Sequence, residues 1–137
     1  MNEHLSDANE TVETPALPEL ASPPLRFIGQ FLDALVAYLM IFVALAVDSS
    51  GFFMVAWGFA VLYILLADGL PGGQSLGKKL LHMRVIEEKS GRACTFGKSF
   101  LRNLLLAALG PIDWVFIFGR KHQRLGDKVA GTIVVKL

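Results

Sequence analysis

Residues 25–47 form an almost unbroken apolar run of 23 residues, LRFIGQFLDALVAYLMIFVALAV. A bilayer hydrocarbon core about 30 Å thick needs roughly 20 helical residues at about 1.5 Å per residue. The run therefore predicts a membrane-spanning helix. Arg26 and Asp33 are the only charged residues within it.

Arg26 and Asp33 lie seven residues apart, so on a helix they share one face. Asp33 is roughly 12 Å along the helix from Leu25, at a depth where an ionisable group costs several kcal/mol unless it is paired or hydrated. Asp33 is therefore either a polar clasp between helices or a site for a cation, a proton or a substrate. Arg26 has the further interpretation of an interfacial anchor that reaches the headgroups.

The expected partners of these carboxylates are basic residues, because an unpaired buried charge is strongly destabilising. We expect Asp33 to pair with Arg102 or Arg26, and Asp127 to pair with another arginine at the cytoplasmic face. Arg26, Asp33, Arg102 and Asp127 are thus the candidate site, either for an ion or proton or as a polar clasp.

A second apolar run, residues 52–67, follows the turn residues 48–51 (DSSG) and predicts a second crossing of about 24 Å. A third run, residues 104–118, would reach only about 22 Å even as one straight helix. Gly110 and Pro111 interrupt it. We therefore expect two half-helices that dip into the membrane and return, or lie at its interface.

The stretch 83–95, MRVIEEKSGRACT, alternates weakly around Ser90 and Gly91 and predicts a β-hairpin. The C-terminal TIVVKL is strand-like, and its pairing with residues 84–86 would complete a three-stranded sheet, because a two-stranded ribbon alone is marginal. The expected fold class is mainly α and integral to the membrane. It comprises two transmembrane helices, a re-entrant or interfacial third segment, and a small cytoplasmic sheet.

Residues 72–79, GGQSLGKK, match only part of a phosphate-binding loop, because Lys79 stands where Ser or Thr would bind magnesium. A membrane helix also precedes the loop, where a nucleotide-binding loop would follow a strand. The favoured interpretation is a short helix capped by Ser75, whose Lys78 and Lys79 contact lipid phosphates. We expect Arg84 to contact lipid phosphates as well.

The chain of 137 residues is 53% hydrophobic and only 18% charged, which favours a small membrane domain over a soluble one. Residues 1–24 differ, because they hold five acidic residues, four prolines and no Lys or Arg. We therefore expect a disordered tail at 1–24 before one membrane domain at 25–137. A lone Cys94 and three scattered histidines predict neither a disulfide framework nor a metal or cofactor site.

Lysine and arginine are unevenly distributed over the predicted connections. Residues 67–99 contain six, the segment after Phe118 contains five, and the loop 48–51 contains none. By the positive-inside rule, both basic segments and both termini are cytoplasmic. The basic residues lack interleaved aromatic residues, so the expected partner is anionic lipid headgroups and not nucleic acid.

Four pieces of the sequence, in this order, resemble the RDD family of bacterial membrane proteins, which is named for one arginine and two aspartates. They are Arg26 with Asp33, GQSLGKKLLHMRVI, the pair Arg102–Asn103, and QRLGDKVAGTIVV. The resemblance, which covers residues 25–137, implies that Arg26 and Asp33 are the family's arginine and first aspartate. It implies Asp127 as the second aspartate, with Asp68 as the alternative. The resemblance also implies a location in the bacterial inner membrane and a role in transport.

Two functions remain open from the sequence. One is the exchange of monovalent cations for protons, implied by the resemblance, in which Asp33 carries the proton or the ion. An exchanger with two crossings would need to be a homo-oligomer to enclose a path. The other is a non-transporting membrane module that binds lipid headgroups or a partner membrane protein. No nucleophile–base or paired-carboxylate pattern predicts an enzyme.

Overall fold

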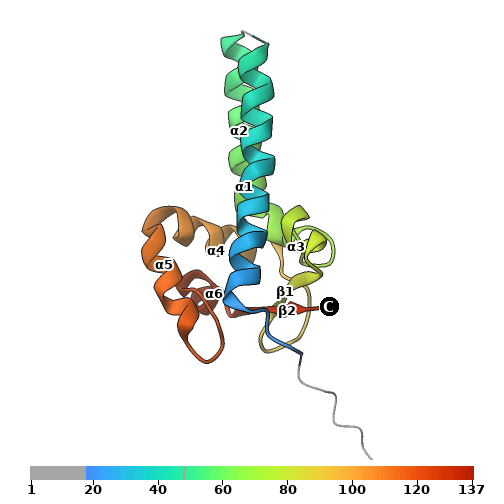
Figure 1. Ribbon diagram of the computed structural model, residues 1–137, viewed down its shortest axis with the longest axis vertical. Helices are drawn as coiled ribbons and strands as arrows, with labels where there is room; N and C mark the ends of the chain where they lie inside the picture. The colour runs from blue at the N-terminus through green and yellow to red at the C-terminus, as the bar shows by residue number, and fades with distance from the viewer. Residues whose placement is uncertain (1–17, 48) are drawn as a thin grey trace, which may run out of the picture.

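The computed structural model describes residues 18–47 and 49–137. Its two longest helices, α1 (Pro23–Ala46) and α2 (Ser50–Leu66), form a hairpin that stands on a compact head (Figure 1). The 3-10 turn η1 (Ala67–Gly69) continues α2. The spans Pro23–Ala46 and Ser50–Gly69 are each long and apolar enough to cross a membrane. The two long apolar runs of the sequence thus form the two helices expected from them.

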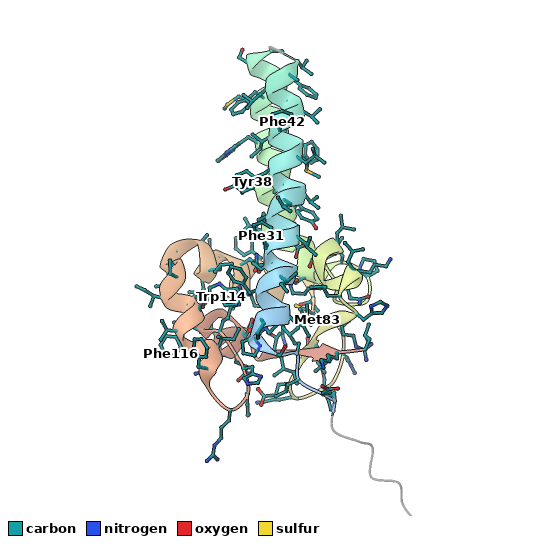
Figure 2. All side chains as sticks on the ribbon, viewed as in Figure 1. Phe31, Tyr38, Phe42, Met83, Trp114 and Phe116 are labelled. Carbon is teal, nitrogen blue, oxygen red and sulfur yellow. The ribbon has the colours of Figure 1, made fainter. Side chains whose placement is uncertain are left out.

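Only the lower half of α1 is enclosed by the head. The buried residues of the whole helix α1 follow one face: Arg26, Gly29, Asp33, Ala37 and Ala44. Further up the hairpin, apolar side chains such as Tyr38 and Phe42 point outward and are 69% and 70% exposed (Figure 2). The polar residues of α1 therefore face protein, and its upper half presents an apolar surface.

The third apolar run forms α4 (Phe96–Leu109), α5 (Pro111–Val115) and the 3-10 turn η2 (Phe116–Phe118). The chain bends by 110° between Leu109 and Pro111, where Gly110 adopts a positive φ of 53° and Pro111 cannot donate to the preceding turn. Helix α4 lies across the base of the hairpin and packs against α2 (Figure 1). Thr95 caps α4, as Ser75 caps the short α3 (Leu76–Leu80).

A two-stranded antiparallel sheet closes the lower side of the head. Strand β1 (Met83–Glu87) pairs with β2 (Thr132–Lys136), with Val85 opposite Val134. Strand β2 follows α6 (Leu125–Ala130), which ends at Gly131 in a left-handed conformation. The predicted pairing of the C-terminal segment with residues 84–86 is confirmed.

The predicted hairpin over residues 83–95 is wrong in one respect. After the turn, the returning chain pairs with β1 only through a single bridge between Ile86 and Ala93. Thr95 already caps α4, so too few residues remain for a third strand. The opposite edge of the sheet is instead covered in part by Leu20, which bridges Val135.

The predicted boundary of the disordered tail also needs correction. Ala21 donates a backbone hydrogen bond to the Val134 carbonyl (2.9 Å), and Lys136 donates one to the Glu19 carbonyl (2.9 Å). Ala21 is fully buried in a small core that also contains Met83, Val85, Cys94 and Val134. The chain is therefore part of the head from about Glu19 onward, and residues 1–17 of the predicted tail lie outside the described residues.

Candidate functional site

The carboxylate of Asp33 lies where α3 and its preceding loop dock against α1. It accepts hydrogen bonds from the Tyr63 hydroxyl (2.8 Å), the Ser75 hydroxyl (2.5 Å) and the Gly77 backbone N–H (2.8 Å). The cation nearest to it is Lys78, with Nζ 3.8 Å from Oδ2. Neither Arg26 nor Arg102 pairs with Asp33, so the predicted partner was wrong. Arg26 shares the face of Asp33 but lies about two turns away, roughly 10 Å.

Gly77 explains why the loop can come so close to α1. A Cβ at this position would collide with the Gly29 carbonyl and would lie 3.1 Å from Cγ of Asp33. Gln74 fixes the other end of the loop by donating to the Met83 carbonyl (2.9 Å). The GGQSLGKK segment is therefore a docking loop for α1, and its glycines allow close packing of backbones.

Lys78 connects Asp33 to a second buried carboxylate. Its Nζ lies 2.5 Å from Oδ1 of Asp68, and the side chain is only 3% exposed. Asp68 also accepts from Asn103 Nδ2 (3.4 Å) and lies 3.6 Å from Arg102 NH2. The expectation that Lys78 contacts lipid phosphates is therefore wrong, because its ammonium is buried against Asp68. Lys79 and Arg84 are exposed, and their contact with lipid remains an expectation.

Asp127 is surrounded by three guanidinium groups. Arg26 NH2 donates to Oδ2, Arg102 NH2 lies 2.8 Å from Oδ1, and Arg124 NH2 lies 3.8 Å from Oδ1. Burial alone would raise the pKa of Asp127, but Arg102, Arg26 and Arg124 outweigh it and hold the pKa well below its usual range. The predicted pairing of Asp127 with an arginine is confirmed, and Arg26 is one of its partners.

Asp113, which the sequence did not single out, completes the cluster. It accepts from the Gly126 backbone N–H (2.8 Å) and lies 3.7 Å from Arg124 Nε. Gly126 packs directly on α4, since a Cβ there would lie 2.5 Å from the Arg102 carbonyl oxygen. The sequence feature that could have pointed to Asp113 is its place just after Gly110–Pro111. An acidic residue in the first turn of a helix interacts favourably with the helix dipole.

These side chains form one connected network of buried charges. Its members are four acids and four bases: Asp33, Asp68, Asp113, Asp127, Arg26, Lys78, Arg102 and Arg124. All are buried, and the formal charges cancel. The network ties α1 to η1, α3, α4, α5 and α6, so it joins the whole head to the base of the hairpin.

The candidate site therefore divides into two parts. Of its four predicted residues, Arg26, Arg102 and Asp127 meet directly, whereas Asp33 reaches them only through Lys78 and Asp68. Lys78 and Asn103 lay within segments already quoted for the family resemblance, so the sequence held a signal for both. Across residues 18–47 and 49–137, no three His, Cys, Asp or Glu side chains are placed to hold a metal ion.

Comparisons with known proteins agree with the family resemblance that the four sequence motifs carry. The model of the RDD family matches residues 20–131, which include all eight members of the network. The "Proline-rich antigen" of Mycobacterium leprae (strain TN) is 30% identical over 92 residues, which are 62% of this chain and 37% of that protein. The chain thus spans well under half of that relative's length, and no solved structure matches it. The two apolar helices point to a membrane protein, and because the family model covers most of the sequence, the chain belongs to the RDD family.

Proposed function

We propose that this protein is a non-transporting membrane module whose head engages lipid headgroups at the membrane surface, and not a monovalent cation/proton exchanger. The supporting observation is that all four buried aspartates are near buried cations in one neutral network. An exchanger needs a carboxylate that gains and loses a proton or an ion in turn. Asp33 is instead engaged by three hydrogen-bond donors and lies close to Lys78.

The hairpin also favours a module over a transporter. Two helices offer no enclosed path through a bilayer, and few of the residues in each span are buried. The ion pairs lie in the lower half of α1 and in the head, where they fix one element to another. In this proposal the network is an assembly clasp, and a second copy or a partner membrane protein would pack against the outer faces of the hairpin.

The proposed orientation places the head and both termini on the cytoplasmic side of the bacterial inner membrane. Residues 19–21 lie along β2, so the two ends of the described chain leave from the same side of the molecule (Figure 1). The beginning of α2 lies at the far end of the hairpin. Exposed Lys79, Arg84 and Arg120 belong to the head, where they would meet anionic headgroups.

The bent third segment would lie within the cytoplasmic leaflet. Ile112 and Val115 are 61% and 66% exposed, an unfavourable state in water for two large apolar side chains on one short helix. Because α4 packs against α2 at the base of the hairpin, these side chains would lie near the hydrocarbon boundary. This is the dipping or interfacial arrangement, supported here by the 110° bend and by the exposed apolar residues.

A flux experiment tests the proposal against the exchanger. Folded wild-type protein in proteoliposomes with an imposed proton gradient should give no proton flux on addition of sodium, potassium or lithium. Asp33→Asn serves as the comparison, provided that it elutes as folded protein, because it removes a carboxylate on α1 that accepts a hydrogen bond from Tyr63 of α2. Cation-dependent flux in the wild type that disappears in folded Asp33→Asn would restore the exchanger.

The lipid part of the proposal has its own measurement. The melting temperature of the protein in nanodiscs should be higher with anionic phosphatidylglycerol than with phosphatidylcholine, and salt should reduce the difference because it screens surface charge. The double variant Lys79→Gln/Arg84→Gln should also reduce the difference in melting temperature between the two lipids. An equal melting temperature in the two lipids would contradict headgroup binding by the head.

A further inference from the structure

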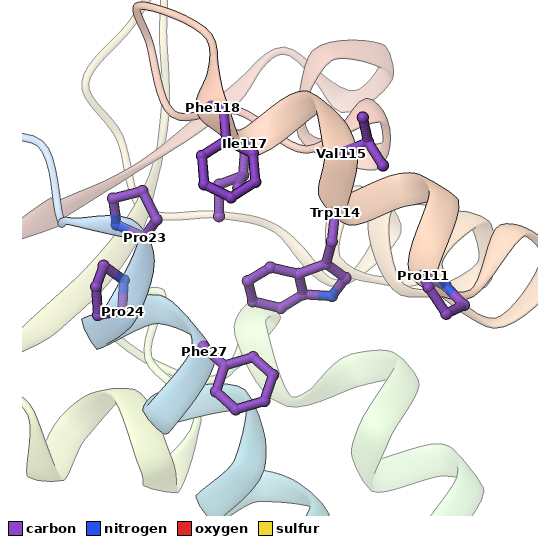
Figure 3. A pocket seen from close by; sticks show the side chains of 8 residues that line it. All are labelled: Pro23, Pro24, Phe27, Pro111, Trp114, Val115, Ile117 and Phe118. Carbon is purple, nitrogen blue, oxygen red and sulfur yellow. The ribbon is translucent and has the colours of Figure 1, made fainter.

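A groove of about 440 Å³ lies between the base of α1 and the bent third segment (Figure 3). This volume is within the range of small-molecule sites, roughly 300–1,000 Å³. No charged residue of the described chain lines the groove. The lining residues come from α1 on one side and from α5 and η2 on the other, and include Pro23, Pro24, Phe27, Trp114, Ile117 and Phe118.

The inner part of the groove is held in place by aromatic contacts. Phe27 meets the Trp114 ring edge-on, with ring centroids 5.6 Å apart. The guanidinium of Arg124, a member of the buried network, lies 5.3 Å from the centre of the Trp114 ring. The indole is therefore fixed from two sides, whereas Phe118 at the rim is 83% exposed. The site is thus a preformed apolar slot with an open outer edge.

The depth of the groove follows from the length of α1. Counting back from Ala46, about 20 helical residues cover the roughly 30 Å of hydrocarbon and reach Phe27. Phe27 and Trp114 then lie at the boundary between hydrocarbon and headgroups, where tryptophan is enriched in membrane proteins. A molecule in the groove would be within reach of both the acyl-chain region and the phosphate layer.

The nearest basic residue along the chain to the outer end of the groove is Arg120. Arg120 is exposed and follows Phe118 by two residues, in a turn where the His122 N–H donates to the Gly119 carbonyl (2.9 Å). Its Cα is therefore within about 7 Å of that of Phe118. Arg120 forms no ion pair with any residue in 18–47 or 49–137. Nearby, Lys128 Nζ lies 5.0 Å from the centre of the exposed Phe116 ring.

We propose that this groove binds one acyl chain of an anionic phospholipid whose phosphate contacts Arg120. An apolar slot beside an unpaired surface arginine matches a molecule with an apolar chain and an anionic head, at the depth where the two meet in a leaflet. This inference rests on the proposed function and names the lipid class and the site on the head. Arg120 supplies the preference for anionic lipid, and Phe27 and Trp114 supply the contact with the chain.

Two single-tryptophan variants test the proposal, since the chain contains only Trp57 and Trp114. Trp57→Phe leaves Trp114 in the groove, and Trp114→Phe leaves Trp57, which is 52% exposed on α2. Each is reconstituted in phosphatidylcholine vesicles that contain dibrominated phosphatidylglycerol or dibrominated phosphatidylcholine, and bromine quenching of fluorescence is measured. Trp114 should show an about fivefold preference for phosphatidylglycerol, the value for one basic residue at a membrane surface. Trp57 should be quenched equally by both lipids.

Charge variants in the Trp57→Phe background assign the preference to Arg120. Arg120→Gln should abolish it, Arg120→Lys should retain it, and Lys89→Gln, at an exposed lysine in the turn after β1, should leave it unchanged. Equal quenching of Trp114 by the two lipids, or a preference that survives Arg120→Gln, overturns the proposal. That result together with a raised melting temperature in phosphatidylglycerol nanodiscs would remove this lipid site and keep the proposed module.

Discussion

Lys78 is the residue on which the two halves of the charge network depend. Its ammonium lies 2.5 Å from Asp68 and 3.8 Å from Asp33, and it is buried. Lys78→Met keeps the length of the side chain but leaves Asp68 without its nearest cation. Because breaking a buried pair costs about 3–5 kcal/mol, we expect Lys78→Met to lower the free energy of unfolding in detergent by about that amount.

A second substitution separates charge pairing from packing. Asp68→Asn in the Lys78→Met background removes the carboxylate that lost its nearest cation, and the remaining three acids and three bases still balance. The double variant should recover about 2 kcal/mol or more, because replacing both members of a buried pair is often close to neutral. Strictly additive losses would show that Lys78 acts through its methylene groups and not through its charge.

Asp127 predicts how stability depends on pH. The guanidiniums hold its pKa in the folded protein below the usual value, so the unfolded state binds more protons in acid. The stabilisation is complete above about pH 5 and is lost as pH falls through and below the usual Asp range near 3.9. We expect a loss of about 1 kcal/mol from this group by pH 3, measured by denaturant unfolding in detergent between pH 7 and pH 3.

Surface carboxylates provide the control for that experiment. Hydrogen bonds from Ser90 and Lys98 lower the pKa of Glu87, and those from Lys121 and Gln123 lower that of Glu88. The variant Glu87→Gln/Glu88→Gln should therefore retain most of the acid sensitivity. If it removes the sensitivity, the buried Asp127 is not its source.

Sequence reasoning at the residue scale identified the right residues and some wrong partners. The seven-residue spacing of Arg26 and Asp33 placed both on one buried face of α1, which the structure confirms. The same spacing cannot tell which distant element meets each residue, because α3 and α6 reach α1 from segments that are 40 to 100 residues away along the chain. Lys78 looked like a surface lysine for this reason, although its loop delivers it to Asp68.

At the scale of elements, the docking loop before α3 is as important as the helices. Gly77 lies against the Gly29 carbonyl with no room for a Cβ. We expect Gly77→Ala to separate α3 from α1, to break the Gly77–Asp33 hydrogen bond, and to destabilise by several kcal/mol, as overpacking of a tight contact does. Thermal unfolding in detergent measures the effect.

Gly97 is the matched control for this prediction. It is also a helical glycine, in the first turn of α4, but nothing lies within 4 Å of an added Cβ. Gly97→Ala should be neutral or stabilise by about 0.5–1 kcal/mol, because alanine favours the helix. Equal melting temperatures for Gly77→Ala and Gly97→Ala would show that the α1–α3 contact is not close in solution.

The elements were more predictable than their pairing. The length of the apolar runs predicted α1 and α2, the Gly110–Pro111 pair predicted the bend, and Ser75 predicted the start of α3, because each is a local property of the chain. The β-hairpin failed because the alternation in residues 83–95 was weak, and the start of α4 at Thr95 limited the returning strand. Residues 19–21 were assigned to the tail because a three-residue edge contact has no periodicity to detect.

At the scale of the whole molecule, the described chain divides into the apolar hairpin, which is the proposed membrane anchor, and a head to which residues 18 and 137 both belong (Figure 1). In the proposed topology, this arrangement requires an even number of crossings. If the bent third segment crossed the membrane instead of dipping, the α6–β2 segment would lie on the opposite side from β1. The antiparallel pairing of β1 with β2 excludes such a separation within one folded chain.

Thiol labelling of intact cells with a membrane-impermeant maleimide tests this topology. Cys94 is buried and burial raises the pKa of its thiol, and Cys94→Ser removes it from the background. In that background Ser49→Cys, at the start of α2, should be labelled from outside, whereas Arg120→Cys and Leu137→Cys should be labelled only after the membrane is opened. Arg120 and Leu137 are both exposed, so protection in intact cells reports the membrane and not burial.

Labelling of Leu137→Cys from outside would place the head in the periplasm and contradict the cytoplasmic assignment. Labelling of Arg120→Cys alone would place residue 120 outside and contradict the dipping third segment.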